Sequence, residues 1–211
     1  SFKGTQARYE NIDIITVREN TEGMYSGLGQ KISDDGQTAE ATSIITRQGA
    51  EQITTFAYEL ARKENRKKVT IVHKANIMKS TSGLFLKVAR EVSLRYPDIT
   101  TEEMIVDATC MKLVMNPENF DVIVTTNLFG DILSDLCAGL VGGLGMAPGA
   151  NIGRDAAIFE AVHGSAPDIA GKNLANPTSV ILASIQMLEY LGMSDKAEMI
   201  RSAVLKQYWI V

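Results

Sequence analysis

The stretch VIVTTNLFGDILSD, residues 122–135, places an apolar β-branched run directly before two carboxylates that are one helical turn apart. The run is typical of a buried strand, and the residues after it have the spacing of a helix. Asp131 and Asp135 are at positions i and i+4 and therefore share a helix face, where two carboxylates suit Mg²⁺ or Mn²⁺. Two acids near a helix start also complement the helix dipole, and in an isolated D-x-x-x-D pattern that structural role is the commoner one.

Strand-like and helix-like segments alternate outward from this stretch. The short apolar runs typical of strands are 12–17, 69–72, 104–106 and 121–125. The apolar helical faces between them contain Ile53, Phe56, Ala57, Leu60 and Ala61, and then Leu84, Phe85, Val88 and Val92. This alternation predicts an α/β fold with an open sheet. Such sheets keep their ligand sites at the carboxyl ends of the strands.

Composition limits the functions that the chain can have. The 211 residues are 45% hydrophobic, which is enough for a packed core in one or two domains. A net charge of −4 provides no field that gathers nucleic acid or an anionic membrane, and no apolar run is long enough to span a bilayer. An anionic substrate must therefore be bound by local positive charge. Cys110 and Cys137 form no metal-binding pattern, so both are predicted to be reduced core thiols.

Four further segments contain polar residues between apolar runs: RENTEGMYSG at 18–27, HKANIM at 73–78, VDATC at 106–110 and EAVHGSAPDIAG at 160–171. Together with residues 127–135 they resemble the metal-dependent β-decarboxylating dehydrogenases, the family of isocitrate, homoisocitrate, isopropylmalate and tartrate dehydrogenases. The resemblance covers roughly residues 10–205 in the family's motif order. The first two segments are most similar to NAD-type isocitrate dehydrogenase.

This resemblance implies NAD-dependent oxidative decarboxylation of isocitrate, a 2-hydroxy tricarboxylate, to 2-oxoglutarate and CO₂. That reaction belongs to the tricarboxylic acid cycle and places the protein in a bacterial cytoplasm or a mitochondrial matrix. The alternatives are homoisocitrate or isopropylmalate as the substrate, or a non-catalytic regulatory or structural subunit of such an enzyme. Regulatory subunits commonly lose part of the acid-base and metal set, whereas Tyr25, Lys74, Asp107, Asp131 and Asp135 are all present.

The family's motifs also imply roles for individual residues. Lys74 follows a strand, where partial desolvation suits a general base, and the resemblance implies that it assists removal of the hydroxyl proton. Tyr25 is implied to protonate the enolate. Arg18 offers a planar fork for a substrate carboxylate, although an ion pair with Glu19 or Glu22 is an equal alternative from the residues alone.

The implied metal site is shared between two subunits. Asp131 and Asp135 would hold Mg²⁺ or Mn²⁺ together with the partner's Asp107, a residue expected to end its own strand. Because Lys74 is also expected to act on the partner's site, the active protein should be a homodimer or a larger oligomer. A hairpin at 23–46 has little core of its own, and the resemblance implies a clasp between subunits there, with a solvated surface hairpin as the alternative.

The nucleotide site does not follow the usual Gly-rich pattern, because no G-x-G-x-x-G follows a strand. Instead, the segment HGSAP at 163–167 resembles the loop that binds the adenosine half of the cofactor in this family. Asp168 suits ribose hydroxyls and would repel the extra phosphate of NADP; with Ile169 it indicates NAD. The implied cofactor-binding residues are Glu160, His163, Gly164, Ser165, Ala166, Asp168, Ile169 and Asn176.

The predicted domain organisation follows the family. Residues 1–22 and 47–141 form a small α/β domain, residues 23–46 the clasp hairpin, and residues 142–211 the C-terminal part of a large nucleotide-binding domain. A glycine-rich segment at 139–149 is predicted to be a flexible crossing. The chain opens in mid-pattern at Ser1, and residues 206–211 do not match the family. We therefore expect a fragment that lacks the upstream substrate-binding arginines and is inactive alone.

Overall fold

The computed structural model describes residues 7–9 and 11–209. The chain divides into two compact units, one of residues 13–134 and one that combines residues 1–12 with 135–211. We call them the sheet unit and the C-terminal unit and describe each by itself. The sequence predicts three parts with boundaries near residues 22, 46 and 141, which differ from the boundaries of these two units. That domain division stays a prediction.

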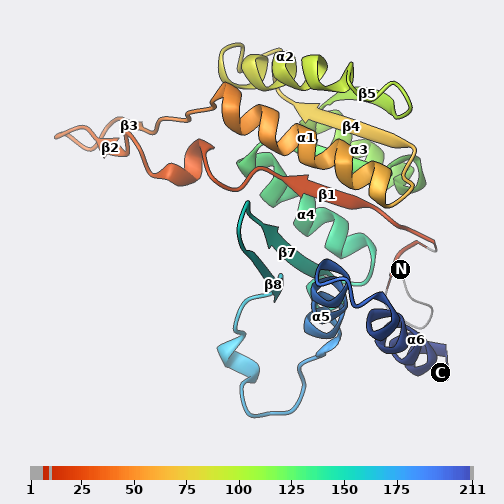
Figure 1. Cartoon of the computed structure of the whole chain (residues 1–211). Coiled ribbons are helices and arrows are strands. Elements are labelled where there is room, and N and C mark those ends of the chain that lie inside the picture. Colours follow the sequence, from red (N-terminus) through yellow and green to blue (C-terminus); the bar gives the residue numbers. More distant parts are fainter. Residues whose placement is uncertain (1–6, 10, 210–211) are drawn as a thin grey trace. The chain divides into compact units, whose positions relative to one another are not determined.

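The sheet unit is built on four parallel strands in the order β1-β6-β4-β5 (Figure 1). Every residue of β6 is buried, as are the four middle residues of β4. Such continuously buried, mostly apolar runs are expected for parallel strands that are covered on both faces. The strands are β1 (Ile15–Arg18), β4 (Lys68–His73), β5 (Thr100–Ile105) and β6 (Val122–Thr125).

Four helices follow these strands: α1 (Arg47–Lys63), α2 (Thr81–Ser93), α3 (Val106–Met115) and α4 (Asn127–Leu140). The chain advances in one direction across the sheet from β1 to β4 and then to β5. Right-handed crossovers therefore place α1 and α2 on the same face, and the reversed step from β5 to β6 places α3 on the opposite face. A buried core fills the space between α1, α2 and the sheet, with Phe85 and Tyr58 among its largest side chains.

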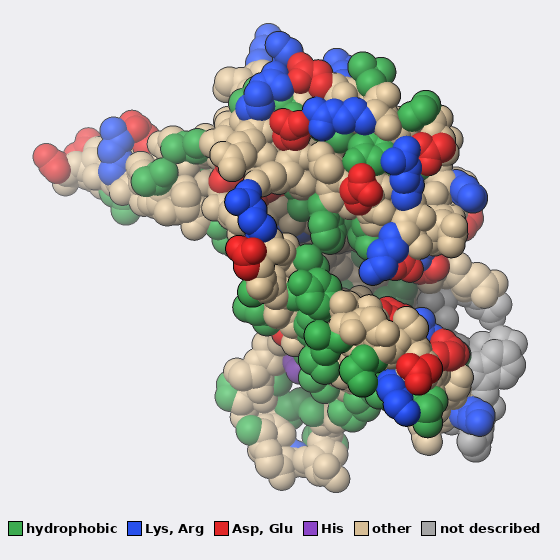
Figure 2. Space-filling view, viewed as in Figure 1, with side chains coloured by type: hydrophobic (Ala, Val, Ile, Leu, Met, Phe, Trp, Pro, Cys, Tyr) green, Lys and Arg blue, Asp and Glu red, His purple; other side chains and the backbone are tan. Residues whose placement is uncertain are grey.

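The clasp hairpin, residues 23–46, extends from the sheet unit as a thin arm with charged side chains along it (Figures 1 and 2). Its two strands are short, β2 (Lys31–Ile32) and β3 (Ala39–Glu40), and all four residues are exposed. Residues 42–45 (TSII) form no strand. Thr46 caps the start of α1, because its side chain accepts a hydrogen bond from the Gly49 amide.

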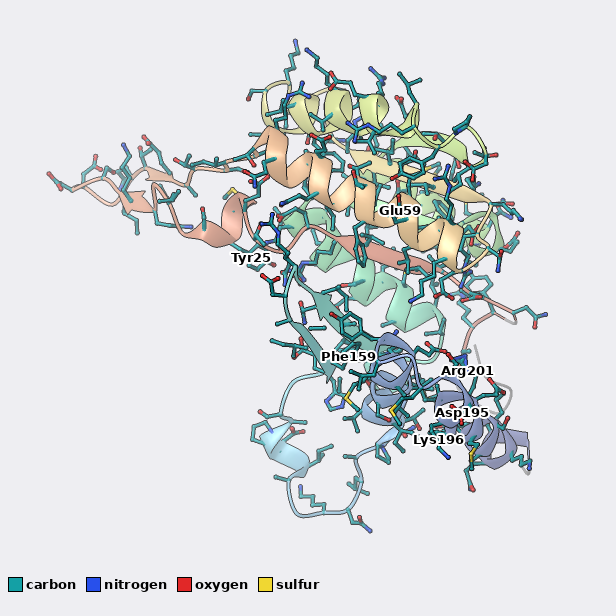
Figure 3. The ribbon with its side chains drawn as sticks, in the orientation of Figure 1. Tyr25, Glu59, Phe159, Asp195, Lys196 and Arg201 are labelled. Carbon is teal, nitrogen blue, oxygen red and sulfur yellow. The ribbon has the colours of Figure 1, made fainter. Side chains whose placement is uncertain are left out.

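The C-terminal unit contains an antiparallel pair, β7 (Pro148–Ile152) and β8 (Ala157–Ala161), and two helices, α5 (Thr178–Tyr190) and α6 (Ser194–Trp209). Helix α5 packs on both strands and on α6. Phe159 on β8, labelled in Figure 3, contacts the ring of Tyr190 at 5.6 Å between centroids. The expected α/β fold is therefore confirmed, with its parallel sheet in the sheet unit.

Two smaller expectations are modified by the structure. Cys110 and Cys137 are half-buried rather than core residues, and neither is in a disulfide. The glycine-rich segment 139–149 is mostly structured, because it contains the end of α4, a 3-10 turn at Leu144–Met146 and the start of β7. Within the described part of the chain, no helix is long and apolar enough to cross a membrane.

Candidate active site

Arg18 is the centre of a polar cluster at the carboxyl ends of two neighbouring strands. It is the last residue of β1 and pairs in register with Thr125 of β6, so its side chain lies beside the start of α4. Its Nε donates to Asn127 Oδ1 at 2.9 Å, and one terminal nitrogen donates to Asp131 Oδ1 at 2.5 Å. The alternative that Arg18 pairs with Glu19 or Glu22 is not what the structure shows, because its ion pair is with Asp131.

Helix α4 accommodates this arginine only because residue 130 is glycine. A Cβ atom at Gly130 would lie 2.5 Å from Arg18 Cγ and 2.7 Å from its Cβ, which is closer than non-bonded carbons can approach. The glycine of the NLFGDILSD motif therefore lets the aliphatic part of Arg18 lie directly against the helix. Its guanidinium then reaches Asp131 one residue further along.

Tyr25 completes the cluster. It lies on a 3-10 turn, Gly23–Ser26, at the base of the clasp hairpin (Figure 3). Its hydroxyl donates to Asp131 Oδ2 at 2.6 Å, and the Arg18 guanidinium lies 5.1 Å from its ring centroid. The bond to Asp131 raises the pKa of Tyr25 above its ordinary value of 10.0. The same bond, and then the charge of Arg18, lower the pKa of Asp131 below 3.8.

Lys74 and Asp107 form a second polar pair, at the carboxyl ends of the other two strands of the sheet, β4 and β5. Lys74 follows β4 in a turn where the Ala75 amide donates to His73 Nδ1 at 3.1 Å. Its ammonium group donates to Asp107 Oδ1, and this bond lowers the pKa of Asp107. Asp107 does not end a strand as expected, because the first turn of α3 already contains it. The Lys74 side chain is 25% exposed and that of Asp107 61%, so the carboxylate faces outward.

The acidic pair on α4 has the donor chemistry of a hard-cation site. Asp131 and Asp135 lie one turn apart on the same helix, and the Asp131 oxygens retain lone pairs after accepting from Arg18 and Tyr25. Among the residues that the structure describes, no three His, Cys, Asp or Glu side chains are grouped to hold a metal ion. Two ligands from α4 fit Mg²⁺ or Mn²⁺ if further oxygen ligands come from elsewhere, and the predicted source is the partner's Asp107.

The predicted cofactor residues lie in the C-terminal unit, most of them in the exposed loop between β8 and α5. His163 Nδ1 is 2.9 Å from the Gly164 carbonyl oxygen, and Gly164, Ser165 and Ala166 are exposed. Ala166 has a left-handed backbone (φ 44°), which turns the chain into a 3-10 turn that carries Asp168 and Ile169. These residues are therefore neighbours on one loop.

Glu160 and Asn176, at the two ends of this loop, already have partners in the structure. Glu160 accepts from Asn151 Nδ2 across the β7–β8 pair at 2.7 Å. Asn176 Oδ1 accepts from the Thr178 amide at 3.0 Å, which caps the start of α5, while its Nδ2 is 3.3 Å from the Tyr208 hydroxyl. Tyr208 lies in α6, so this helix contacts the start of α5 through the Tyr208 hydroxyl.

Two buried polar residues of the sheet unit were not predicted as site residues. Glu19 is 5% exposed, and its carboxylate accepts the amides of Thr21 at 2.8 Å and Glu22 at 3.1 Å. Asn127 is 2% exposed and bridges Arg18 to the Glu22 carbonyl oxygen. Both follow the end of a strand and lie inside one of the sequence motifs described above. Their place at a strand end is the feature of the sequence that could have identified them as site residues.

Comparison with known proteins agrees with this geometry. The family described as Isocitrate/isopropylmalate dehydrogenase matches residues 2–208. The expectation that the ending 206–211 does not match the family is therefore wrong for residues 206–208. The chain is 53% identical over 97% of its length to the isocitrate dehydrogenase [NAD] catalytic subunit 5, mitochondrial, of Arabidopsis thaliana. It is 53% identical over 98% of its length to the chloroplastic 3-isopropylmalate dehydrogenase of Solanum tuberosum. It is also 54% identical over 97% of its length to a mitochondrial regulatory subunit of the NAD isocitrate dehydrogenase of Dictyostelium discoideum.

A solved structure of isocitrate dehydrogenase from Methylococcus capsulatus superimposes with a TM-score of 0.94 at 55% identity and covers 99% of this chain. The chain spans 54%, 57% and 58% of the three relatives and 62% of the solved chain. Relatives with different substrates are equally similar, so the comparisons identify the family and not the substrate. The chain belongs to the isocitrate/isopropylmalate dehydrogenase family.

Proposed function

We propose that the complete protein catalyses NAD-dependent oxidative decarboxylation of isocitrate to 2-oxoglutarate and CO₂. One observation carries this proposal: Arg18, Tyr25 and Asp131 converge at the carboxyl ends of adjacent parallel strands, with the Arg18 and Tyr25 donors on one carboxylate. The cluster combines a cation for a substrate carboxylate, a neutral phenol and a metal-binding acid. These are the groups that oxidation followed by decarboxylation of a hydroxy acid requires.

Each residue has a distinct task in this proposal. Arg18 binds and orients a substrate carboxylate through its planar fork. Lys74 assists removal of the hydroxyl proton, and the raised pKa of Tyr25 keeps its phenol protonated so that it can return a proton to the enolate carbon. When bound at Asp131, Asp135 and the partner's Asp107, a divalent cation supplies charge stabilisation, and bound NAD supplies the hydride acceptor.

The proposed nucleotide is NAD because Asp168 provides a carboxylate for ribose hydroxyls at the position where NADP would bring a phosphate. The loop residues His163 to Ala166, with Ile169, would lie along the adenosine half. Glu160 and Asn176 would complete the site from the two ends of the loop. Asn176 would have to exchange its contact with Tyr208 for one with the adenine.

A shared site requires a second copy of the chain, and the sheet unit has an apolar surface suited to one. Helix α3 exposes Met111, Val114 and Met115, with exposed fractions of 55%, 42% and 63% at i, i+3 and i+4 spacing. Asp107 lies in the first turn of this helix, and its ion-pair partner Lys74 directly follows β4. The clasp hairpin also exposes Ile32 (71%). We therefore propose a homodimer, or a larger oligomer, in which these surfaces meet their two-fold equivalents.

The alternatives are homoisocitrate dehydrogenase, isopropylmalate dehydrogenase and a regulatory subunit, because relatives with each of those names are about as similar. The regulatory alternative is favoured only by the similarity to the Dictyostelium protein. The acid-base pair Tyr25 and Lys74, together with three acidic residues, favours catalysis. The proposed location is a bacterial cytoplasm or a mitochondrial matrix.

Turnover by the complete protein tests the proposal. The three substrates isocitrate, homoisocitrate and isopropylmalate would each be assayed with NAD and with NADP in the presence of Mn²⁺. We expect the highest kcat/KM for isocitrate with NAD, and its loss in Tyr25→Phe and Lys74→Met variants. A higher kcat/KM for another substrate would transfer the assignment to it. Absence of turnover, combined with stimulation of a separate catalytic subunit, would establish the regulatory alternative.

A further inference from the structure

We propose that Asn127 is a positioning residue that holds the Arg18 guanidinium in its place against Asp131. The role of Arg18 as the substrate-carboxylate ligand rests on the proposed function above; the physical link between Asn127 and Arg18 does not. Asn127 is the first residue of α4, directly after the end of β6, and Arg18 ends the neighbouring strand β1. The two residues are 109 positions apart in the chain and meet through the sheet register.

Both ends of the Asn127 amide are used, and in opposite directions. Its Oδ1 accepts from Arg18 Nε at 2.9 Å, while its Nδ2 donates to the Glu22 carbonyl oxygen at 3.0 Å. Asparagine at a helix start commonly accepts a backbone N–H of the first turn. Here the side-chain oxygen accepts from a guanidinium instead. The side chain is 2% exposed, so water competes little with either bond.

Glu22, which accepts a hydrogen bond from the Asn127 side-chain amide, is itself held in place. The Glu22 carboxylate accepts the Thr46 amide at 2.9 Å and the Thr46 hydroxyl at 2.8 Å, which ties Glu22 to the start of α1. The buried Glu19 carboxylate accepts the Glu22 amide at 3.1 Å. Glu22 is therefore bound through its amide, its carbonyl and its side chain. Because Asn127 is bonded to this fixed residue, its Oδ1 has a fixed position from which to accept the hydrogen bond from Arg18 Nε.

Arginine needs such support because its long side chain has several rotatable bonds and loses rotamer entropy when it is ordered. The bond from Nε to Asn127 defines the plane of the guanidinium, and the bond to Asp131 holds one edge of that plane. Without Asn127, Arg18 would keep its charge but lose its fixed orientation. Hydrogen bonds to charged groups contribute enough that losing one weakens binding about ten- to a hundredfold.

The test compares Asn127→Leu, which removes both bonds, with Asn127→Asp, which keeps the acceptor for Arg18 and loses the donor to Glu22. Thr54→Val is the matched control, because it also removes a buried hydrogen bond, from Thr54 to the Ala50 carbonyl in α1, at a distance from Arg18 in the chain. The complete protein would be labelled with ¹⁵N at arginine Nε. The Arg18 resonance would be assigned by its loss in Arg18→Lys.

We expect the Arg18 Nε proton to exchange with solvent about ten times faster or more in Asn127→Leu, less so in Asn127→Asp, and at the parental rate in Thr54→Val. We also expect KM for the substrate to rise about ten- to a hundredfold in Asn127→Leu with a smaller change in kcat, and no further rise when Asn127→Leu is added to Arg18→Lys. Unchanged exchange in both Asn127 variants, or equal acceleration in Thr54→Val, would overturn the proposal. A changed exchange rate in a protein without turnover would refute the proposed function and leave the positioning role supported.

Discussion

The sheet unit and the C-terminal unit differ in how their proposed functional residues are held. In the sheet unit, Arg18, Tyr25 and Asp131 are joined by hydrogen bonds and supported by the buried Asn127. In the C-terminal unit, residues 162–168 are exposed on a loop whose one regular element is a 3-10 turn. We therefore expect the proposed chemistry site to be organised before ligands bind, and the proposed nucleotide loop to gain order on binding.

The two units also differ in their cores. Both units expose large apolar side chains, but the sheet unit contains most of the buried ones. In the C-terminal unit, exposed apolar side chains lie on α5 and α6 and in the segment between them. These side chains include Val180, Met187, Leu191, Met193 and Met199, with exposed fractions from 38% to 65%. The C-terminal unit therefore buries less of its apolar surface within this chain than the sheet unit does.

The largest expected effect comes from the core of the sheet unit. Phe85→Ala removes a ring that is 1% exposed between α1, α2 and the sheet, and should cost about 3–5 kcal/mol of unfolding free energy. Met187→Ala, at a side chain 38% exposed on α5, should cost less than about 1.5 kcal/mol. Urea unfolding followed by circular dichroism measures both. Equal losses would contradict the contrast between the two cores.

Metal binding tests the preorganised cluster. Asp131→Asn removes one charge and weakens an oxygen ligand, so Mn²⁺ affinity should fall by roughly one to three orders of magnitude while the fold is retained. Calorimetric titration of the assembled protein measures the affinity. Asp34→Asn, on the exposed clasp hairpin, is the control and should bind Mn²⁺ like the parent. Superimposable curves for Asp131→Asn and the parent would exclude Asp131 as a ligand.

Cofactor preference tests the exposed loop. Replacing Asp168 by lysine and Ile169 by tyrosine in the complete protein removes a charge that repels the extra phosphate and supplies a cation for it. The ratio of kcat/KM for NADP to that for NAD should rise on the order of tenfold to a hundredfold. The unfolding midpoint should hardly change, because Asp168 is exposed. A parent enzyme that already prefers NADP would show that this interpretation of Asp168 is wrong.

The smallest expected effect concerns a surface pair of the sheet unit. The Arg62 guanidinium holds the pKa of Asp98 at about 2, below its ordinary value of 3.8. Because the pKa in the folded state is depressed, the pair stabilises the fold above pH about 4, and this contribution is lost as the pH falls toward about 2. In Arg62→Ala, the pKa of Asp98 should return toward 3.8, as carboxyl NMR titration would show. Lys31→Ala, which breaks a clasp-hairpin pair, should leave Asp98 unchanged.

The sequence predicted the interior of the sheet better than its edges. Runs 69–72 and 121–125 correspond to β4 and β6, because strands buried on both faces need a mostly apolar sequence. The β-branched residues at 42–46 are typical of a strand, but they belong to the return of the clasp hairpin and the cap of α1. Asp107 was expected at a strand end, yet α3 begins at Val106 directly after β5, and periodicity cannot locate a junction without a turn.

The candidate site was predictable as a set of residue types but not as a network. The motifs indicated Arg18, Tyr25 and Asp131, and the structure brings these three together, although their catalytic and ligand roles stay predictions. The role of Asn127 could not be seen, because it depends on β1 lying beside β6 in one register. The space that Gly130 leaves for Arg18 was hidden for the same reason. Both features arise from contacts between segments that are distant in the sequence.

The bonds between Glu22 and Thr46 affect how freely the hairpin between these residues can vary in sequence and length. They close the ends of the clasp hairpin against the start of α1, so the residues between them contribute little to the sheet unit's core. Each doubling of the length of a closed loop adds only about 0.6 kcal/mol to the entropic cost of closing it. The length and composition of this segment can therefore change at little cost in stability. We therefore expect the hairpin to tolerate insertions and substitutions that the buried strands of the sheet unit would not.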